Sequence, residues 1–348
     1  MAQVHGQSLR GVPRRASVLL LGAGVVLLGV YALWCCLDAE TPPAFLPPAG
    51  EAIEGEAPFR FAVVGDNRGN QSAFEEVLAG IKQDHVELLL HTGDIVKRCG
   101  ERQFEWVLHE LVEEDMEVPV CAVPGNHDVA DGAPNAYLLY ERAFGPRRYW
   151  FSCADTLFVA FDDARKLCAP EDLGWLDRTL SLRRQQYRQC FVYMHVPPVD
   201  PRPGSRHALP ADDAERLMAV LRKHDITAIF AGHIHSYLET AVDGIPLYIT
   251  GGAGGTRDEP LGPHHYLLCE VREDGRFDVR KVDVDEVTDN DYLEYALRAK
   301  FPAQGILAAA VVLLLAGVIP SRRAYVRACR GAPGPQLPER APGEGPAA

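Results

Sequence analysis

Polar residues of a few types follow apolar runs at five places along this chain, always in short pieces that contain glycine or proline. The runs at residues 59–64, 87–91, 118–123, 191–194 and 227–231 have the length and apolar content of buried strands. Because the carboxyl ends of neighbouring strands meet in one crevice, five such pieces in order predict a single site. The pieces are Gly65-Asp66-Asn67-Arg68-Gly69, Gly93-Asp94, Pro124-Gly125-Asn126-His127-Asp128, Met194-His195-Val196-Pro197-Pro198 and Gly232-His233-Ile234-His235.

The side chains in these pieces favour a catalytic metal site. A lone His or Asp at a strand end is more often a core or capping residue, but five ordered pieces outweigh that interpretation. Carboxylate oxygen, amide oxygen and imidazole nitrogen suit divalent Mn, Fe, Zn or Ni, whereas structural zinc is usually held by thiolates. The candidate metal ligands are Asp66, Asp94, Asn126, His195, His233 and His235.

The set and its order resemble the calcineurin-like metallophosphoesterase family, whose motifs run Asp-x-His, Gly-Asp, Gly-Asn-His-Asp/Glu, a lone His, and Gly-His-x-His. The resemblance covers residues 59–284 and implies an α/β fold, an αββα sandwich of two mixed sheets with two divalent metal ions at their edge. It also implies that water activated by the metals hydrolyses a phosphate mono- or diester. It implies that Asp94 bridges the metals, that Asp66 and His235 hold the first, and that Asn126, His195 and His233 hold the second.

Two residues of the third piece are implied to act beside the metals. By the resemblance, His127 supplies a proton or an equivalent dipole to the leaving alkoxide, and Asp128 fixes the tautomer of that ring. The sequence has no Gly-x-Ser-x-Gly elbow, no Cys/His nucleophile signature and no Gly-x-x-x-x-Gly-Lys-Ser/Thr loop. We therefore expect no covalent enzyme intermediate.

The first piece departs from the family pattern, because Arg68 stands where a ligand histidine is usual. A guanidinium stays protonated and offers no lone pair to a metal. If the segment is extended, residues 66 and 68 point to the same side, and Arg68 can grip a substrate phosphate. Arg98 is similar in position to a phosphate-binding arginine of the Ser/Thr phosphatase branch, or is a solvated loop charge. The same departure motivates an alternative function, a catalytically silent binding or sensor module.

Length and charge fit one catalytic domain with attachments. The chain has 348 residues, of which 47% are hydrophobic, so residues 59–295 can form a single domain with a large core. The formal net charge is -13, and many arginines lie in the tails, so the domain has no broad basic face and nucleic acid is not an expected partner. Helical patterns alternate with the strands at residues 71–83, 101–115, 172–184 and 212–224.

Two apolar runs predict a membrane anchor at each end. Residues 17–37 carry no charge and are long enough, at 1.5 Å per residue, to cross a hydrocarbon core of about 30 Å. Residues 301–319 form the second run. Arginines lie in residues 1–16 and in the tail, residues 320–348, on the sides away from the domain. The positive-inside rule therefore predicts cytoplasmic ends and an extracytoplasmic domain.

Other interpretations of the ends stay open. The first run can be a cleaved signal peptide, and the second can be a buried or amphipathic helix. Gly22-Ala23-Gly24 indicates close helix packing or is mere composition. Residues 38–58 are rich in Pro and Glu, which predicts an extended tether. In an oxidising compartment, Cys99 and Cys168 are the best candidates for a disulfide.

Overall fold

The computed structural model describes residues 19–29, 49–130, 135–255, 263–284 and 309–315. The chain divides into two compact units, one of residues 42–295 and one that joins residues 1–41 with residues 296–348. The larger unit contains both sheets and all of the candidate site residues.

A five-stranded sheet in the order β12-β11-β2-β3-β4 forms one half of the larger unit. Strands β2, β3 and β4 run parallel, β11 pairs antiparallel with β2, and β12 pairs antiparallel with β11. Phe74, Val77, Leu78 and Ile81 recur at helical spacing on one side of α2, and this buried stripe packs on the sheet. The elements of this half are β2 (Phe59–Val64), β3 (Leu88–His91), β4 (Val120–Ala122), β11 (His265–Val271), β12 (Phe277–Asp283), α2 (Gln71–Gln83), α3 (Glu101–Glu113) and α4 (Leu138–Phe144).

A seven-stranded mixed sheet in the order β1-β5-β6-β7-β8-β10-β9 forms the other half. Its outer layer, α5 and α6, buries the leucines Leu176, Leu180, Leu217 and Leu221 against the sheet. Pro170 at the first position of α5, with acidic residues in its first turn, suits the start of a helix. The elements are β1 (Ala52–Ile53), β5 (Tyr149–Cys153), β6 (Thr156–Ala160), β7 (Gln189–Tyr193), β8 (Ala228–Ala231), β9 (Tyr237–Val242), β10 (Ile245–Thr250), α5 (Pro170–Arg183), a 3-10 turn η1 (Arg184–Gln186) and α6 (Ala211–Leu221).

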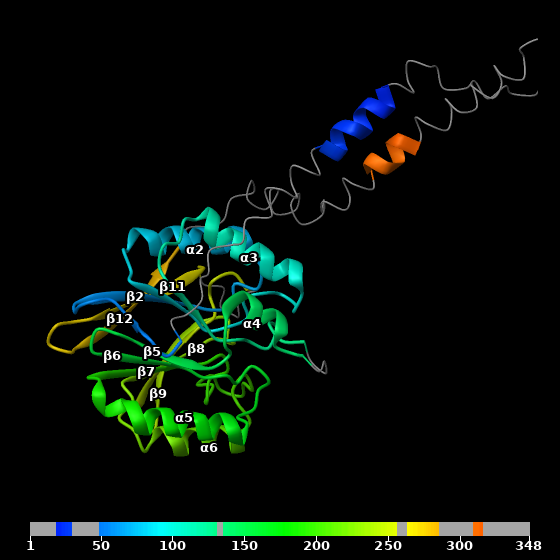
Figure 1. Cartoon of the computed structure of the whole chain (residues 1–348). Coiled ribbons are helices and arrows are strands. Elements are labelled where there is room, and N and C mark those ends of the chain that lie inside the picture. Colours follow the sequence, from blue (N-terminus) through cyan, green and yellow to red (C-terminus); the bar gives the residue numbers. More distant parts are fainter. Residues whose placement is uncertain (1–18, 30–48, 131–134, 256–262, 285–308, 316–348) are drawn as a thin grey trace, which may run out of the picture. The chain divides into compact units, whose positions relative to one another are not determined.

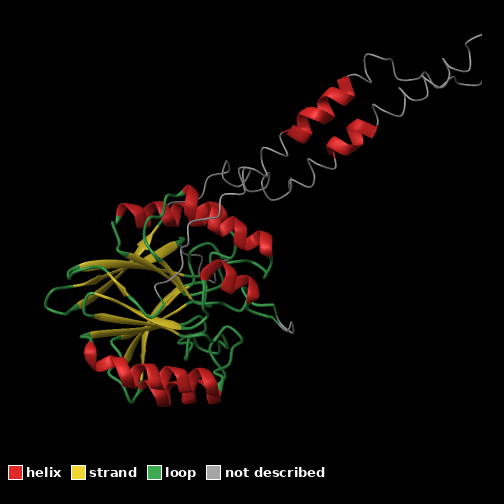
Figure 2. Cartoon of the chain, viewed as in Figure 1, coloured by secondary structure: helices red, strands yellow, loops and turns green. Residues whose placement is uncertain are grey.

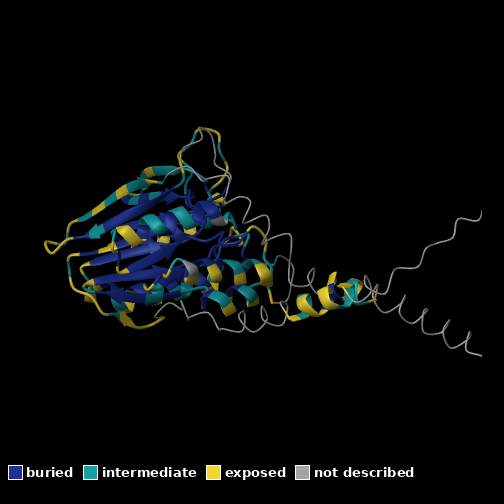
Figure 3. Ribbon diagram, turned by 90° about the horizontal axis from the view of Figure 1, so that it is seen from above, coloured by how far each residue is buried: buried dark blue, intermediate teal, exposed yellow. Residues whose placement is uncertain are grey.

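The two sheets face each other across an aromatic core. Phe61 of β2 and Phe158 of β6 meet edge to face with ring centroids 5.2 Å apart, and Phe191 and Phe277 lie 4.6 Å apart. The layer order is helix, sheet, sheet, helix (Figures 1 and 2), with buried strands between helices whose outer faces are exposed (Figure 3). The predicted two-sheet α/β sandwich is confirmed.

The predicted elements agree best where the pattern is long or strictly periodic. The strand at residues 59–64 and the helix at residues 71–83 have the predicted bounds. The sequence interpretation missed the hairpin of β5 and β6 and the short helix α4. The disulfide candidates Cys99 and Cys168 are free and pack with different core clusters, on opposite outer layers of the sandwich.

Only parts of the predicted membrane segments lie within the described residues. Residues 19–29 and 309–315 are helical, and a Cβ built on Gly24 would stand 2.7 Å from Leu314 Cγ, so the glycine permits close contact between the two helices. Among the described residues, the structure contains no helix that is both long and apolar enough to span a bilayer. The remainder of residues 17–37 and 301–319, with the outer tails and residues 38–48 of the linker, lies outside the described residues.

Candidate metal centre

Four residues of the predicted site have left-handed backbone. The φ angles are 59° at Asp66, 49° at Arg68, 54° at Asp94 and 66° at His233. Such angles are uncommon outside glycine, are tolerated best by Asn, Asp and His, and gather at functional sites. The extended geometry expected at residues 66 and 68 was therefore wrong, although Arg68 still faces the site.

Backbone hydrogen bonds tie the loops that carry these residues. Asp66 N donates to Gly93 O at 2.9 Å, and Arg68 N donates to Asp94 O at 3.0 Å. Gly255 N donates to the carbonyl of Asp66 at 2.6 Å, so this amide of the glycine-rich turn after β10 supports the site loop instead of lining a cleft. Backbone hydrogen bonds consequently connect the loops after β2, β3 and β10 to one another.

Close packing around Asp66 explains a glycine of the last motif. A Cβ at Gly232 would lie 2.6 Å from Asp66 Oδ2, closer than any real Cβ contact. The same carboxylate oxygen accepts the backbone N–H of His233 at 2.8 Å. The Gly-His-x-His piece thus fits against the first aspartate only because a glycine begins it.

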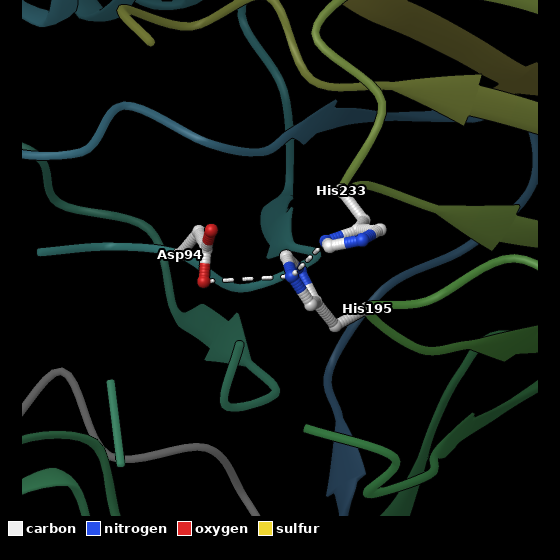
Figure 4. Close-up of side chains that lie close together, drawn as sticks. All are labelled: Asp94, His195 and His233. Carbon is white, nitrogen blue, oxygen red and sulfur yellow. Dashed lines mark hydrogen bonds and ion pairs between the residues drawn. The ribbon is translucent and has the colours of Figure 1, made fainter. Parts of the chain in front are cut away.

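One candidate triad consists of Asp94, His195 and His233 (Figure 4). His195 Nδ1 donates to Thr92 O at 2.9 Å, and because a carbonyl only accepts, Nε2 of the neutral ring keeps its lone pair. That Nε2 lies 3.1 Å from Asn126 Oδ1, 3.2 Å from His233 Nδ1 and 3.4 Å from Asp94 Oδ1. Four groups that can each present a lone pair therefore converge, which suits a cation.

The second candidate triad consists of Asp66, Asp94 and His235, whose ligand atoms lie within 4.8 Å of one another. His235 Nε2 is 3.4 Å from Asp66 Oδ1. Asp94 belongs to both triads, so it lies where a bridging ligand is required. All six predicted ligands are brought together by the fold.

Two buried atoms at the site lack a hydrogen-bond partner among the described residues. They are Asp66 Oδ1 and His233 Nε2. Buried polar atoms are nearly always satisfied, so each exception calls for a ligand or a function. Oxygen and imidazole donors of this kind match the ligand preferences of divalent transition metals. The residues fit a dinuclear divalent metal site.

The protonation states of the histidines differ. Burial, and then the neighbouring His195, lower the pKa of His233 to about 2, so its ring is neutral near pH 7, as metal ligation requires. Burial also opposes the charge on His195, but the carboxylates of Asp94 and Asp66 outweigh it and raise the pKa of His195. A divalent cation would compete with a proton for this nitrogen.

His127 faces the site, but Asp128 does not orient it as expected. His127 Nδ1 donates to the carbonyl of Lys97 at 2.6 Å, while Nε2 lies 4.0 Å from Asp94 Oδ2. The buried Asp128 carboxylate instead accepts backbone N–H groups of Ile95, Val96 and Gly125. Asp128 therefore connects the loop that follows Asp94 to Gly125 of its own motif. The tautomer of His127 is fixed by the carbonyl of Lys97 instead.

The two arginines expected at the substrate phosphate differ in position. Arg68 contacts the rings of both His127 and His235, and its Nε lies 3.9 Å from Asp94 Oδ2. Arg98 is exposed in the loop before α3, where its backbone N–H donates to Gln103. The geometry thus brings Arg68 into the site and leaves Arg98 at the surface of the loop.

Sequence reasoning missed a buried carboxylate that supports His195. Asp163 follows β6, and its oxygens accept the backbone N–H groups of His195 and Val196 at 2.9 to 3.1 Å. Burial raises the pKa of Asp163 to about 7. The signal was available, because Asp162 and Asp163 follow the apolar residues 156–161 in the same manner as the recognised pieces follow their strands.

The family pattern described as calcineurin-like phosphoesterase matches residues 59–237. The chain belongs to this family. The matched region includes all six candidate metal ligands, His127 and Arg68.

Curated relatives are distant. A probable cyclic nucleotide phosphodiesterase of Fibrobacter succinogenes is 22% identical over 173 residues, which cover 47% of this chain and 64% of that protein. A probable glycerophosphodiester phosphodiesterase of Arcobacter nitrofigilis is 22% identical over 209 residues, 55% of this chain and 68% of that protein. The chain thus matches just under two thirds of the length of the first relative.

Among solved structures, a purple acid phosphatase from yellow lupin (Lupinus luteus) seeds superposes with a TM-score of 0.50 at 15% identity. The superposition covers 68% of this chain and 55% of the lupin protein. Similarity at this level of identity concerns the fold alone.

Proposed function

We propose that this protein hydrolyses a phosphate ester, with a diester as the favoured substrate, in a reaction that depends on two divalent metal ions. The observation that carries the proposal is the pair of triads that share Asp94 at the carboxyl ends of strands from both sheets. Diesters are favoured because both curated relatives bear the names of phosphodiesterases.

In this proposal Asp66, Asp94 and His235 hold one cation, and Asp94, Asn126, His195 and His233 hold the other. Two divalent cations at such a site lower the pKa of a shared water and neutralise charge on the phosphoryl oxygens. Asp94 would be the ligand that the two cations share, and the backbone N–H of His127 donates to Asp94 Oδ1 at 2.7 Å, which orients that carboxylate.

His127 and Arg68 act on the substrate side of the metals. Because Nδ1 of His127 donates to Lys97 O, Nε2 is the atom that is available to the leaving oxygen. It would give that oxygen a proton only from the imidazolium form, after the ring has left Arg68 Nη2, which can only donate to it. The Arg68 guanidinium has several N–H donors for the phosphate oxygens. Arg98 would add hydrogen bonds to the substrate phosphate only if its loop moved toward the substrate.

Turnover of an aryl phosphate and of an aryl phosphodiester, each with added Mn²⁺, tests the proposal. We expect the wild-type chain to be active on at least one of them and Asp94→Ala to fall to the background rate, because both triads lose a ligand. Arg102→Ala is a matched control, since Arg102 is an exposed residue of α3. A wild-type chain that binds Mn²⁺ but turns over neither ester would contradict the proposal.

The second candidate is a catalytically silent binding or sensor module on the same fold. It is favoured by one observation, the contact of the Arg68 guanidinium with His235 and His127, which are respectively a candidate ligand and the candidate acid. Tight binding of a phosphodiester by the Mn²⁺-loaded chain without any turnover would support this candidate over the enzyme.

We also propose that two membrane segments, residues 17–37 and 301–319, anchor the domain on the outer side of the membrane. The arginine clusters outside both segments support this orientation. The exposed apolar side chains Leu19, Val25, Val26 and Val312 suit contact with lipid, and a glycine at a helix contact is typical of membrane helices.

The topology is tested with a protease applied to intact cells. We expect the catalytic domain to be cleaved while a tag placed after residue 348 stays protected. Protection of the domain until the cells are lysed would overturn the proposed orientation, and release of the domain by a carbonate wash would overturn the anchors.

A further inference from the structure

Arg68 lies against the ligand atoms of the Asp66–Asp94–His235 triad. Its Nη1 is 3.3 Å from His235 Nε2, and its Nη2 contacts His127 Nε2. A guanidinium only donates hydrogen bonds, so the atom that it meets on His235 must present a lone pair. The stem of Arg68 is confined as well, because a Cβ built on Gly255 would lie 3.2 Å from its Cδ.

The nitrogen that Arg68 contacts is the one that faces the neighbouring carboxylate. His235 Nε2 lies 3.4 Å from Asp66 Oδ1, one of the two buried site atoms that lack a hydrogen-bond partner among the described residues. One lone pair serves either an N–H donor or a metal ion. A cation bound beside Asp66 would also be repelled by the guanidinium, whose charge is permanent.

The other triad has no such competitor. Among the described residues, no guanidinium or ammonium group hydrogen-bonds to Asn126, His195 or His233. Burial does not distinguish the two triads, because each consists of two buried residues and one half-buried histidine.

Arg68 also approaches Asp94, the ligand that both triads share, with its Nε 3.9 Å from Oδ2, but its hydrogen bonds go to His235 and His127. Beyond the shared Asp94, one side therefore offers Asn126, His195 and His233 without a guanidinium hydrogen bond among the described residues. The other side offers Asp66 and His235, and Arg68 contacts His235.

We propose that Arg68 competes with a metal ion for His235 Nε2, so that the two triads bind divalent metal with unequal affinity. The Asn126–His195–His233 side binds tightly, and the Asp66–His235 side binds weakly and exchanges its metal. This inference rests on the proposed metal-dependent function, and it gives the chain a site whose second metal depends on the free metal concentration.

Mn²⁺ titration of the full chain tests the inference without any use of activity. Calorimetry gives the affinities, and electron paramagnetic resonance of unbound Mn²⁺ gives the stoichiometry. We expect two affinity classes in the wild type, and an increase of about 10- to 100-fold for the weaker class in Arg68→Ala, the range that loss of a charged hydrogen bond allows. The tighter class should change much less, because Arg68 reaches it only through the 3.9 Å contact with the shared Asp94.

Further variants assign the classes and guard against misfolding. Arg68→Gln keeps an N–H donor without the charge and should give a smaller gain than Arg68→Ala, whereas Arg102→Ala should give none. His235→Ala should abolish the weaker class only. Thermal unfolding of each variant shows that it folds.

The outcomes separate this inference from the proposed function. Equal affinity of the weaker class in the wild type and in both Arg68 variants would overturn the competition and leave metal-dependent hydrolysis standing. Equal affinity of the wild type for two Mn²⁺ ions would likewise overturn the competition and leave metal-dependent hydrolysis standing. Failure of every folded variant to bind Mn²⁺ would overturn both.

Discussion

The two triads share Asp94 yet stand in different surroundings. On one side, His195 is fully buried, its ring is held by Thr92 O, and its backbone N–H is held by Asp163. On the other side, His235 is partly exposed and a guanidinium lies on its Nε2. The departure at Arg68, visible in the sequence, thus becomes a difference between the two triads, and part of that difference comes from neighbours that are not ligands.

Removing one ligand from each side tests the comparison most strongly. His233→Ala should abolish the tighter Mn²⁺ class and His235→Ala the weaker one, because each histidine belongs to one triad only. Metal content after dialysis at low free Mn²⁺ is the measurement. Loss of both metals from His235→Ala would mean that the triads bind cooperatively and are not separable.

The next largest effect concerns His127, which lies beside the triads without belonging to either. His127→Ala should lower turnover by about 100- to 10,000-fold, the usual contribution of a general acid, while both Mn²⁺ classes remain. Single-turnover kinetics check the loss of turnover, and metal titration of the same sample checks that Mn²⁺ binding is retained. Stoichiometric loss of metal would make His127 a ligand instead of an acid.

Variants of Asp163 test how the Asp94–His195–His233 triad is held in place. Asp163→Ala should weaken the tighter Mn²⁺ class by about 10- to 100-fold, the usual range for residues that orient metal ligands, and should leave the weaker class unchanged. Asp163→Asn should recover much of the loss, since its amide oxygen still accepts the His195 N–H. Equal losses in both classes would show that Asp163 stabilises the whole domain and does not position His195.

The smallest effect concerns His91, which supports the loops that carry Asp66 and Asp94. Its Nε2 donates to Asn67 Oδ1 at 3.1 Å, and Gly93 N donates to its Nδ1. Burial lowers the pKa of His91 to about 3. Below a pH of about 6.5 the unfolded chain therefore binds a proton that the folded chain does not, and the free energy of unfolding falls as the pH falls.

His91→Gln cannot titrate but keeps one donor and one acceptor. Between pH 7 and pH 5 the wild type should lose about 2 kcal/mol more of its free energy of unfolding than this variant does. Urea unfolding at both pH values is the measurement. Identical pH dependence in the two chains would mean that His91 accepts a proton in the folded state.

The convergence of the six candidate ligands could be predicted from sequence because the pieces that carry them follow apolar strands, where chain order and sheet geometry fix the position. The role of Asp128 could not be predicted, because its partners are the backbone N–H groups of residues 95 and 96, which carry no signature in sequence. The contact of Arg68 with His235 joins residues 167 positions apart and depends on a left-handed turn that side-chain pattern does not encode. Asp163 follows an apolar run as well, but its partners are the backbone N–H groups of His195 and Val196, so its role could not be predicted from side-chain types.

The left-handed backbone at the site lowers the stability of the folded chain in exchange for the positions of its side chains. It occurs at Asp66, Arg68, Asp94 and His233. Each such residue costs roughly 1 to 2 kcal/mol relative to glycine, which adopts these angles without a steric penalty. Glycine would remove this steric cost at all four positions. At Asp66 and Asp94, however, it would also remove the carboxylates that accept the backbone N–H groups of His233 and His127. A descendant that no longer needed the reaction would therefore gain thermal stability first at Arg68 and His233.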